Sequence, residues 1–193
     1  MRIVAGRHRG RVLKAPRGRS TRPTAARARE GLFNILAHGG FGTDGGSVLD
    51  GARVLEAFAG TGAFTFEALS RGAASATLLD LNEDALEAAR TNAKALGERE
   101  AAHVLRMDAV RPRTAEAAHD LVFLDPPYGL RLGAKALMAL AAKGWIAPGA
   151  LVIIEVGAKE DFAPPAGFAA VEERRFGAAR FVLMRFEGTA SAA

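Results

Sequence analysis

The sequence predicts an α/β protein built on a mostly parallel β-sheet. From residue 53 onward, short apolar segments alternate with segments of helical length, which is the pattern of parallel strands joined by right-handed crossovers. The last two segments, 171–176 and 180–186, lie on either side of Gly177 and predict a hairpin that completes the sheet with an antiparallel strand. An arginine-rich stretch precedes this region. We therefore expect a seven-stranded sheet preceded by a basic N-terminal extension.

Residues 1–37 are expected to form this extension from a hairpin and one helix. Residues 2–5 and 11–14 are half-apolar and lie on either side of a turn flanked by glycines, which predicts a β-hairpin. After a loop, Thr24 is the expected N-cap of a helix that continues to Leu36. The apolar face expected for this helix consists of Ala28, Leu32, Ile35 and Leu36.

The main domain is expected at residues 52–187. Glycine-rich residues 37–51 separate it from the extension, and residues 188–193 are expected to be a disordered tail. Asn82 and Gly97 are the expected caps of the longest helix in this domain. The expected strands are 53–57, 76–81, 103–107, 120–124 and 151–156, and the expected helices are 63–71, 83–96 and 132–143.

Positive charge is concentrated in the extension. Residues 1–30 carry ten basic residues and one acid, a net charge of +9, whereas the rest of the chain has a net charge of −4. An arginine-dense arm on a mildly acidic core is typical of proteins that contact a phosphate backbone, although a solvated surface run is the alternative. The candidates for phosphate contacts are Arg7, Arg9, Arg11, Arg22, Arg27 and Arg29.

Composition excludes several classes of protein. The chain has no cysteine, so it has neither a disulfide framework nor a thiolate metal site. Its four histidines are scattered, and we expect no bound metal. No apolar run approaches membrane-spanning length, and the basic N-terminus lacks the apolar segment of a signal peptide. We therefore expect a cytoplasmic protein that makes no membrane contact.

The most informative stretch is the apolar strand 121–124 followed by Asp125, Pro126, Pro127 and Tyr128. Prolines have no backbone N–H, so this loop presents carboxylate and carbonyl oxygens with no donor beside them. Such a loop suits an amino group with two N–H donors, and the tyrosine adds a flat face for stacking. The stretch therefore predicts a site for the exocyclic amine of a nucleobase, with a simple turn as the alternative.

The first strand of the domain ends in a glycine-containing turn. Gly60 and Gly62 permit a ligand to approach the backbone closely. A dinucleotide fingerprint would have glycine or alanine at position 65, where Thr65 stands. The carboxylate of Glu56 beside this loop favours a ligand with a positive amino group over one with a pyrophosphate. The loop thus favours S-adenosylmethionine over NAD.

Two further acids lie at the ends of the next two strands. Asp80 lies about twenty residues beyond the glycine loop, the spacing at which an acid reaches the ribose hydroxyls of an adenosine cofactor. Asp108 follows the third strand and is a candidate acceptor for the adenine amino group. For each acid taken alone, the alternative to a cofactor contact is a role in a turn or as a helix cap. Their placement at successive strand ends supports a cofactor site.

With these motifs, the chain resembles the bacterial small-subunit rRNA guanine-N2 methyltransferases, the family that modifies guanine 966 of 16S rRNA. The resemblance implies a class I, Rossmann-like methyltransferase fold, S-adenosylmethionine as the methyl donor, and an extension that helps to hold rRNA. Aspartate is usual in this family where Glu56 stands. The motifs that carry the resemblance are residues 1–3, 6–11, 22–24, 27–36, 58–62, 67–73 and 125–128.

The resemblance also implies roles for individual residues. Phe58 joins the cofactor-binding loop, and Arg22 and Thr24 lie either on the RNA-facing rim or in the closure over the cofactor. The implied partner is 16S rRNA, within a small-subunit assembly particle, with no obligate protein partner. The implied catalytic residues are Asp125, Pro126, Pro127 and Tyr128.

Three other functions remain open from the sequence. An adenine-N6 methyltransferase of DNA would use the same acceptor loop, but the chain has no region large enough for sequence-specific duplex readout. A non-catalytic ribosome-assembly module would use the same fold as an RNA-binding platform. A nicotinamide oxidoreductase fits least, because the third glycine is missing and the acceptor loop offers no group for hydride transfer.

Overall fold

The computed structural model describes residues 1–15, 23–42, 44–127, 132–177 and 179–188, with the side chains of the first helix described from Arg27 on. Its centre is a seven-stranded sheet in the order β3-β2-β1-β4-β5-β7-β6. The first five strands in this order are parallel, and β7 is antiparallel to both of its neighbours. The strands are β1 (Arg53–Ala57), β2 (Ser75–Asp80), β3 (Ala102–Arg106), β4 (His119–Leu124), β5 (Ile146–Gly157), β6 (Phe168–Phe176) and β7 (Ala179–Phe186).

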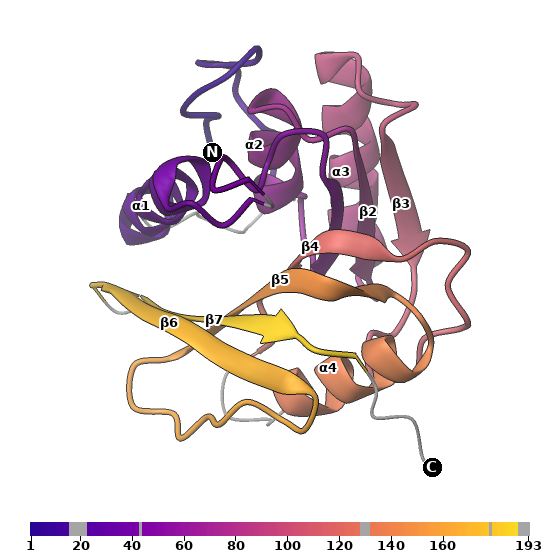
Figure 1. Ribbon diagram of the computed structural model, residues 1–193. Helices are drawn as coiled ribbons and strands as arrows, with labels where there is room; N and C mark the ends of the chain where they lie inside the picture. Colours follow the sequence, from indigo (N-terminus) through magenta and orange to yellow (C-terminus); the bar gives the residue numbers. More distant parts are fainter. Residues whose placement is uncertain (16–22, 43, 128–131, 178, 189–193) are drawn as a thin grey trace.

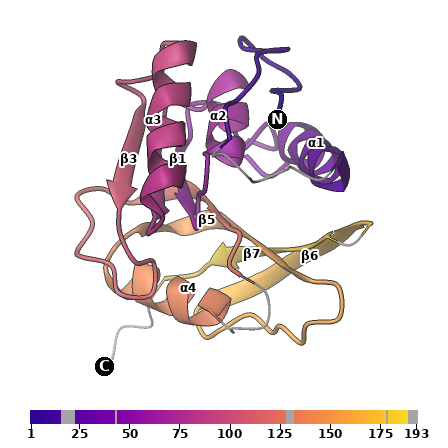
Figure 2. The same ribbon diagram turned by 180° about the vertical axis from the view of Figure 1, so that it is seen from behind.

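Helices cover both faces of this sheet (Figure 1). The helices are α1 (Pro23–His38), α2 (Ala63–Ser70), α3 (Glu83–Leu96) and α4 (Leu132–Ala142). Helices α1, α2 and α3 lie on one face, and α4 lies on the other, as the reverse view also shows (Figure 2). This order of strands and layers confirms the expected α/β class and the class I methyltransferase fold.

The predicted local signals for the elements of the main domain are confirmed. Helix α3 spans the predicted residues; the Asn82 side chain accepts a hydrogen bond from the backbone N–H of Ala85, and Gly97 has a positive φ of 76°. Strand β5 begins five residues earlier than expected, because Ile146 pairs with His119 before a shift in register. A bulge lets the pairing resume further along both strands.

The predicted N-cap of the first helix is wrong. Helix α1 begins at Pro23, so Thr24 lies within its first turn. Proline suits the first position of a helix, because its fixed φ is helical and its missing N–H would have no partner there. The described part of this helix also buries Phe33, which the expected apolar face left out, whereas Ile35 is only half-buried.

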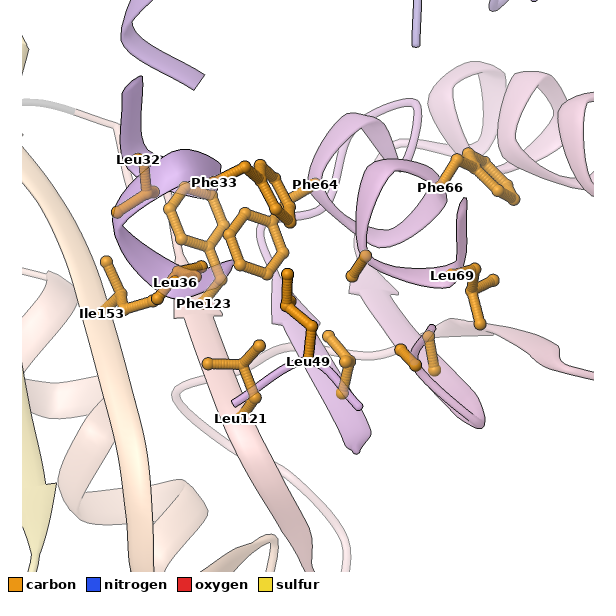
Figure 3. Packing of buried hydrophobic residues seen from close by; sticks show 14 of the residues in the cluster. Leu32, Phe33, Leu36, Leu49, Phe64, Phe66, Leu69, Leu121, Phe123 and Ile153 are labelled. Carbon is orange, nitrogen blue, oxygen red and sulfur yellow. The ribbon is translucent and has the colours of Figure 1, made fainter. Parts of the chain in front are cut away.

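Aromatic rings fix α1 on the sheet. Phe33 of α1 lies 4.7 Å from Phe64 of α2, and Phe64 stacks on Phe123 of β4 with ring centroids 4.2 Å apart (Figure 3). Offset aromatic contacts of this kind add stabilisation beyond the burial of apolar area. The helix of the extension therefore shares one hydrophobic core with the sheet.

The N-terminal hairpin is smaller than expected. Arg2 and Val12 form an isolated antiparallel bridge, and the backbone N–H of Ile3 donates to the carbonyl of Arg11 at 3.0 Å. Ile3 and Leu13 are buried in the core that includes α1 and α2. The segment is thus held mainly by packing and by contacts with α2.

Glu67 at the end of α2 forms a docking point for this segment. Its carboxylate accepts hydrogen bonds from the backbone N–H groups of Val4 at 2.8 Å and Ala5 at 3.1 Å. It also forms an ion pair with Arg71 at 2.8 Å. The carboxylate therefore satisfies two backbone donors that have no strand partner.

Ser70 continues the same docking contact. Its carbonyl accepts from the backbone N–H of Arg7 at 2.8 Å, and its hydroxyl oxygen accepts from that of His8 at 2.9 Å. A Cβ atom at Gly6, where φ is +79°, would lie 1.8 Å from the Ser70 carbonyl oxygen. The run 67–73 that marks the family resemblance thus holds the extension against α2.

We expect Glu67→Ala to lower the free energy of unfolding by about 3 kcal/mol, because it leaves two part-buried backbone donors and Arg71 without their acceptor. Denaturation in urea measures this loss. Glu116→Ala is the matched control, since the Glu116 side chain is 92% exposed. A loss for Glu67→Ala no larger than the control would contradict the docking role.

Candidate functional site

The predicted cofactor residues gather at one edge of the sheet. Register places Ala57 of β1 beside Leu79 of β2 and Leu124 of β4, so the loops that follow these strands start side by side. The chain runs from β1 outward to β2 and β3, then crosses back to β4 on the other side of β1. Ligands of open parallel sheets bind at this kind of reversal, beyond the carboxyl ends of the strands.

The glycine loop follows β1 and has an unusual backbone. Gly60 and Gly62 have φ values of 55° and 77°, and a Cβ atom at Gly62 would lie 2.6 Å from the Leu78 side chain. Phe58 also has a positive φ, 59°. Strain in a residue other than glycine is typical of binding loops, where surrounding contacts maintain it.

Asp80 at the end of β2 holds the glycine loop in this shape. One of its carboxylate oxygens accepts from the backbone N–H of Gly60 at 2.7 Å, and the other accepts from that of Asn82 at 2.8 Å. At the end of β3, the carboxylate of Asp108 accepts from the backbone N–H of Val110 at 3.0 Å. Both acids are half-buried, and each ionised oxygen has a further lone pair for a hydroxyl or amino donor.

Glu56 lies beneath the loop. Its carboxylate is buried and accepts from the backbone N–H groups of Phe64 at 3.3 Å and Thr65 at 2.9 Å, in the first turn of α2. Burial raises the pKa of Glu56 to about 7, although these hydrogen bonds act in the opposite direction. Both oxygens of Glu56 thus accept hydrogen bonds from the N-terminus of α2. Sequence spacing does not reveal this contact.

Asp125 follows β4 beside this loop. Its backbone N–H donates to the carbonyl of Ala57 at 3.4 Å, and Pro126 after it is buried whereas Pro127 is exposed. Asp125 is exposed at the surface. Its pKa is raised to about 7, first by desolvation and then through the charges of Glu155 and Glu56. The predicted position of Tyr128 lies outside the described residues.

We expect methyl transfer to depend on the ionisation of Asp125. The carboxylate form accepts two hydrogen bonds, and a pKa of about 7 leaves most of the group protonated at pH 6. The value of kcat/KM should therefore rise about tenfold per pH unit below pH 7 and level off above it. A profile from pH 5.5 to 9 measures this. In Asp125→Asn the inflection should disappear; if it persists, Glu56 is the titrating group.

Four of the predicted phosphate-contacting arginines are exposed. Arg7, Arg9, Arg11 and Arg27 lie on the surface of the extension. Arg7 pairs with Glu98 at 2.7 Å, and Arg11 donates to the carbonyl of Ala95 at 2.7 Å. The contact of Arg11 is exposed and costs little to exchange for a phosphate, whereas Glu98, the partner of Arg7, is buried. These four side chains form the exposed basic surface of the extension.

Arg29 has a different environment. Its guanidinium turns inward, donates to the carbonyl of Arg2 at 3.1 Å, and has a lowered pKa because it is buried. Its Nε atom has no partner within the described part of the chain. This placement favours a structural role over a phosphate contact. The predictions for Arg22 and for the side chain of Thr24 fall outside the described residues.

Asn92 of α3 connects the extension to the glycine loop. Its amide oxygen accepts from the backbone N–H of Lys14 at 2.8 Å, and its amide nitrogen donates to the carbonyls of Lys14 at 3.0 Å and Thr61 at 3.3 Å. The side chain is 2% exposed. The sequence did not indicate a role for this residue, because a single asparagine in an amphipathic helix carries no signal of its partners.

The described residues contain neither a metal-binding cluster nor a membrane-spanning helix. No cluster of histidine, aspartate and glutamate in them is arranged to hold a metal ion. None of their helices combines the length and apolar character needed to cross a membrane.

Comparison with known proteins gives consistent matches over nearly the whole chain. The family model described as Conserved hypothetical protein 95 matches residues 1–185. The ribosomal RNA small subunit methyltransferase D of Haemophilus influenzae is 31% identical over 181 residues, covering 92% of this chain and 89% of that protein. The Escherichia coli protein of the same name is 36% identical over 156 residues, covering 80% and 74%. The solved structure of yhhF from Escherichia coli is 32% identical, with a TM-score of 0.80 over 98% of this chain and 99% of that one.

Proposed function

The chain belongs to the Conserved hypothetical protein 95 family, among relatives named small subunit rRNA methyltransferase D, and we propose the following reaction for it. It transfers a methyl group from S-adenosylmethionine to the exocyclic N2 amine of a guanine in small-subunit rRNA. The observation that carries the proposal is the loop of Asp125 and Pro126, which presents acceptors without neighbouring donors at the switch point of the sheet.

The residues at the strand ends fit S-adenosylmethionine. The positive φ values of Phe58, Gly60 and Gly62 let the loop backbone approach the ligand closely. Asp80 and Asp108 offer carboxylate oxygens at the end of adjacent strands, which suit ribose hydroxyls and an adenine amine. When bound, the cofactor supplies an electrophilic methyl group on a positive sulfonium.

Glu56 contributes to this site as a positioning residue. Its oxygens are engaged by α2, so it acts through the shape of the loop and through its charge. When ionised, it lies beneath a site that receives a cation, and the two charges attract. Cofactor binding and ionisation of Glu56 therefore favour each other.

The chain activates the amine by orienting it. The guanine N2 lone pair is delocalised into the ring and is a weak nucleophile. Hydrogen bonds from its two N–H groups to the Asp125 carboxylate and the Pro126 carbonyl favour pyramidal geometry and direct the lone pair at the methyl carbon. The N–C bond forms as the S–C bond breaks, and the carboxylate offsets the positive charge that develops on nitrogen. The extra proton then leaves to Asp125 or to water.

The extension binds the RNA. The exposed Arg7, Arg9, Arg11 and Arg27 neutralise phosphates, and residues 1–37 thus serve substrate binding while residues 52–187 carry the chemistry. A stacked guanine hides its amine, so the base must leave the stack; on sequence grounds, Tyr128 provides its stacking surface. The substrate is rRNA in a small-subunit assembly particle, which places the protein in the cytoplasm.

Methyl incorporation tests this proposal. Labelled S-adenosylmethionine is supplied with small-subunit particles or naked rRNA from a strain that lacks the activity, and the modified nucleoside is identified by mass. We expect N2-methylguanosine at a single site, with particles as the better substrate. N6-methyladenine in a DNA substrate would indicate the DNA enzyme instead, and tight cofactor binding without any transfer would indicate an assembly module.

A further inference from the structure

Glu155 lies beside the acceptor loop on the neighbouring strand. Strands β4 and β5 are parallel, with Leu124 opposite Ile154. Asp125 and Glu155 are therefore the next residues on the two strands. The backbone N–H of Asp125 still donates to Ala57 of β1, so the strand geometry extends to this position. Glu155 is half-buried.

The two carboxylates project from the same face of the sheet. Phe123 and Ile153 belong to the core beneath α1, where Figure 3 shows them near Leu36. Leu124 and Ile154 belong to the core on the opposite face. Because successive side chains of a strand alternate between faces, residues 125 and 155 project on the α1 face. Glu155 thus adds a second carboxylate to the side of the site that Asp125 occupies.

The charges of the two groups interact. After desolvation, the charge of Glu155 makes the larger contribution to the raised pKa of Asp125, and the charge of Glu56 makes the smaller one. Two adjacent carboxylates repel each other, and a ligand that presents adjacent N–H donors to them relieves this repulsion. The pair therefore selects for a group with a row of donors.

We propose that Glu155 determines base specificity by accepting a hydrogen bond from the N1–H of the target guanine, while Asp125 and Pro126 hold its N2 amine. This inference rests on the proposed function. Guanine presents N1–H and the N2 amine side by side, and an ionised carboxylate accepts only. Adenine has a lone pair at N1 beside its amine, and a carboxylate repels that lone pair. Glu155 thus supplies the discrimination that the acceptor loop alone lacks.

A base analogue separates this role from a structural one. Fragments of small-subunit rRNA are prepared with guanine or 2,6-diaminopurine at the target position. The analogue keeps the N2 amine but has a lone pair at N1. We expect the wild-type protein to favour guanine by about a hundredfold in kcat/KM. Glu155→Gln should reduce this preference to about tenfold or less, because the amide of glutamine can donate to the lone pair.

Two controls accompany the measurement. Glu187→Gln removes an exposed carboxylate beyond the far end of β7 and should keep the wild-type preference. Cofactor affinity of Glu155→Gln, measured by calorimetry, should match the wild type and shows that the variant is folded. An equal loss on both RNAs, or an unchanged preference, would overturn the role of Glu155 while the proposed function stands. If the wild type methylates neither RNA, the proposed function falls and the inference with it.

Discussion

Asp125→Ala should reduce the turnover of methyl transfer by about a thousandfold or more, since it removes the carboxylate that orients the amine and offsets its developing charge. Cofactor affinity should stay within about threefold of the wild type, because the glycine loop is held by Asp80 and Glu56. Single-turnover methylation of rRNA and calorimetric titration of S-adenosylmethionine measure the two quantities separately.

Asp125→Asn gives a graded comparison. Its amide oxygen still accepts one hydrogen bond but carries no charge, so the loss should be about ten- to a hundredfold. The matched control is Asp120→Asn, near the opposite end of the same strand, where the Asp120 carboxylate pairs with Arg53 at 3.2 Å on the surface. Full activity in Asp125→Ala would exclude this residue from the chemistry.

The second large effect is expected at the basic surface of the extension. Combined replacement of Arg9, Arg11 and Arg27 by alanine removes three exposed guanidinium groups. The affinity for rRNA at about 0.1 M salt should fall by one to two orders of magnitude, and the slope of log affinity against log salt should decrease by about two units. Filter binding over a series of salt concentrations measures both.

The choice of variant matters because the extension is part of the core. A deletion of residues 1–20 would remove Ile3 and Leu13, which are buried, and so would confuse RNA binding with folding. The control replaces Arg53, Arg113 and Lys143, three exposed cations at or near the amino ends of strands. If this control weakens binding as much as the arginine triple, the effect reflects net charge and not the extension.

Local patterns in the sequence were sufficient for the fold. Buried strands such as β1 and β4 contain short apolar runs, and the caps of α3 are an asparagine and a glycine at the required positions. These signals act over a few residues, because they reflect burial and the backbone conformations of individual residue types. The acceptor loop was equally predictable from the sequence, since the lack of N–H donors follows from proline itself.

Tertiary structure decided which polar groups meet. Glu67 contacts Val4 across 63 positions in the chain, and Asn92 contacts Lys14 across 78. Arg29 turns inward in the helix that leaves Arg27 exposed. Such pairings depend on how helices and loops dock on the finished sheet. The spacing of apolar residues along the sequence carries no information about that docking.

The α/β fold, the glycine loop and the acceptor motif were thus predictable from residue order alone, because each depends on local backbone chemistry. Only the tertiary structure showed that Glu56 is held by the first turn of α2, and that Glu155 of β5 lies beside Asp125. The physical reason is strand order. Placing β4 between β1 and β5 brings carboxylates together from segments about 30 or more residues apart.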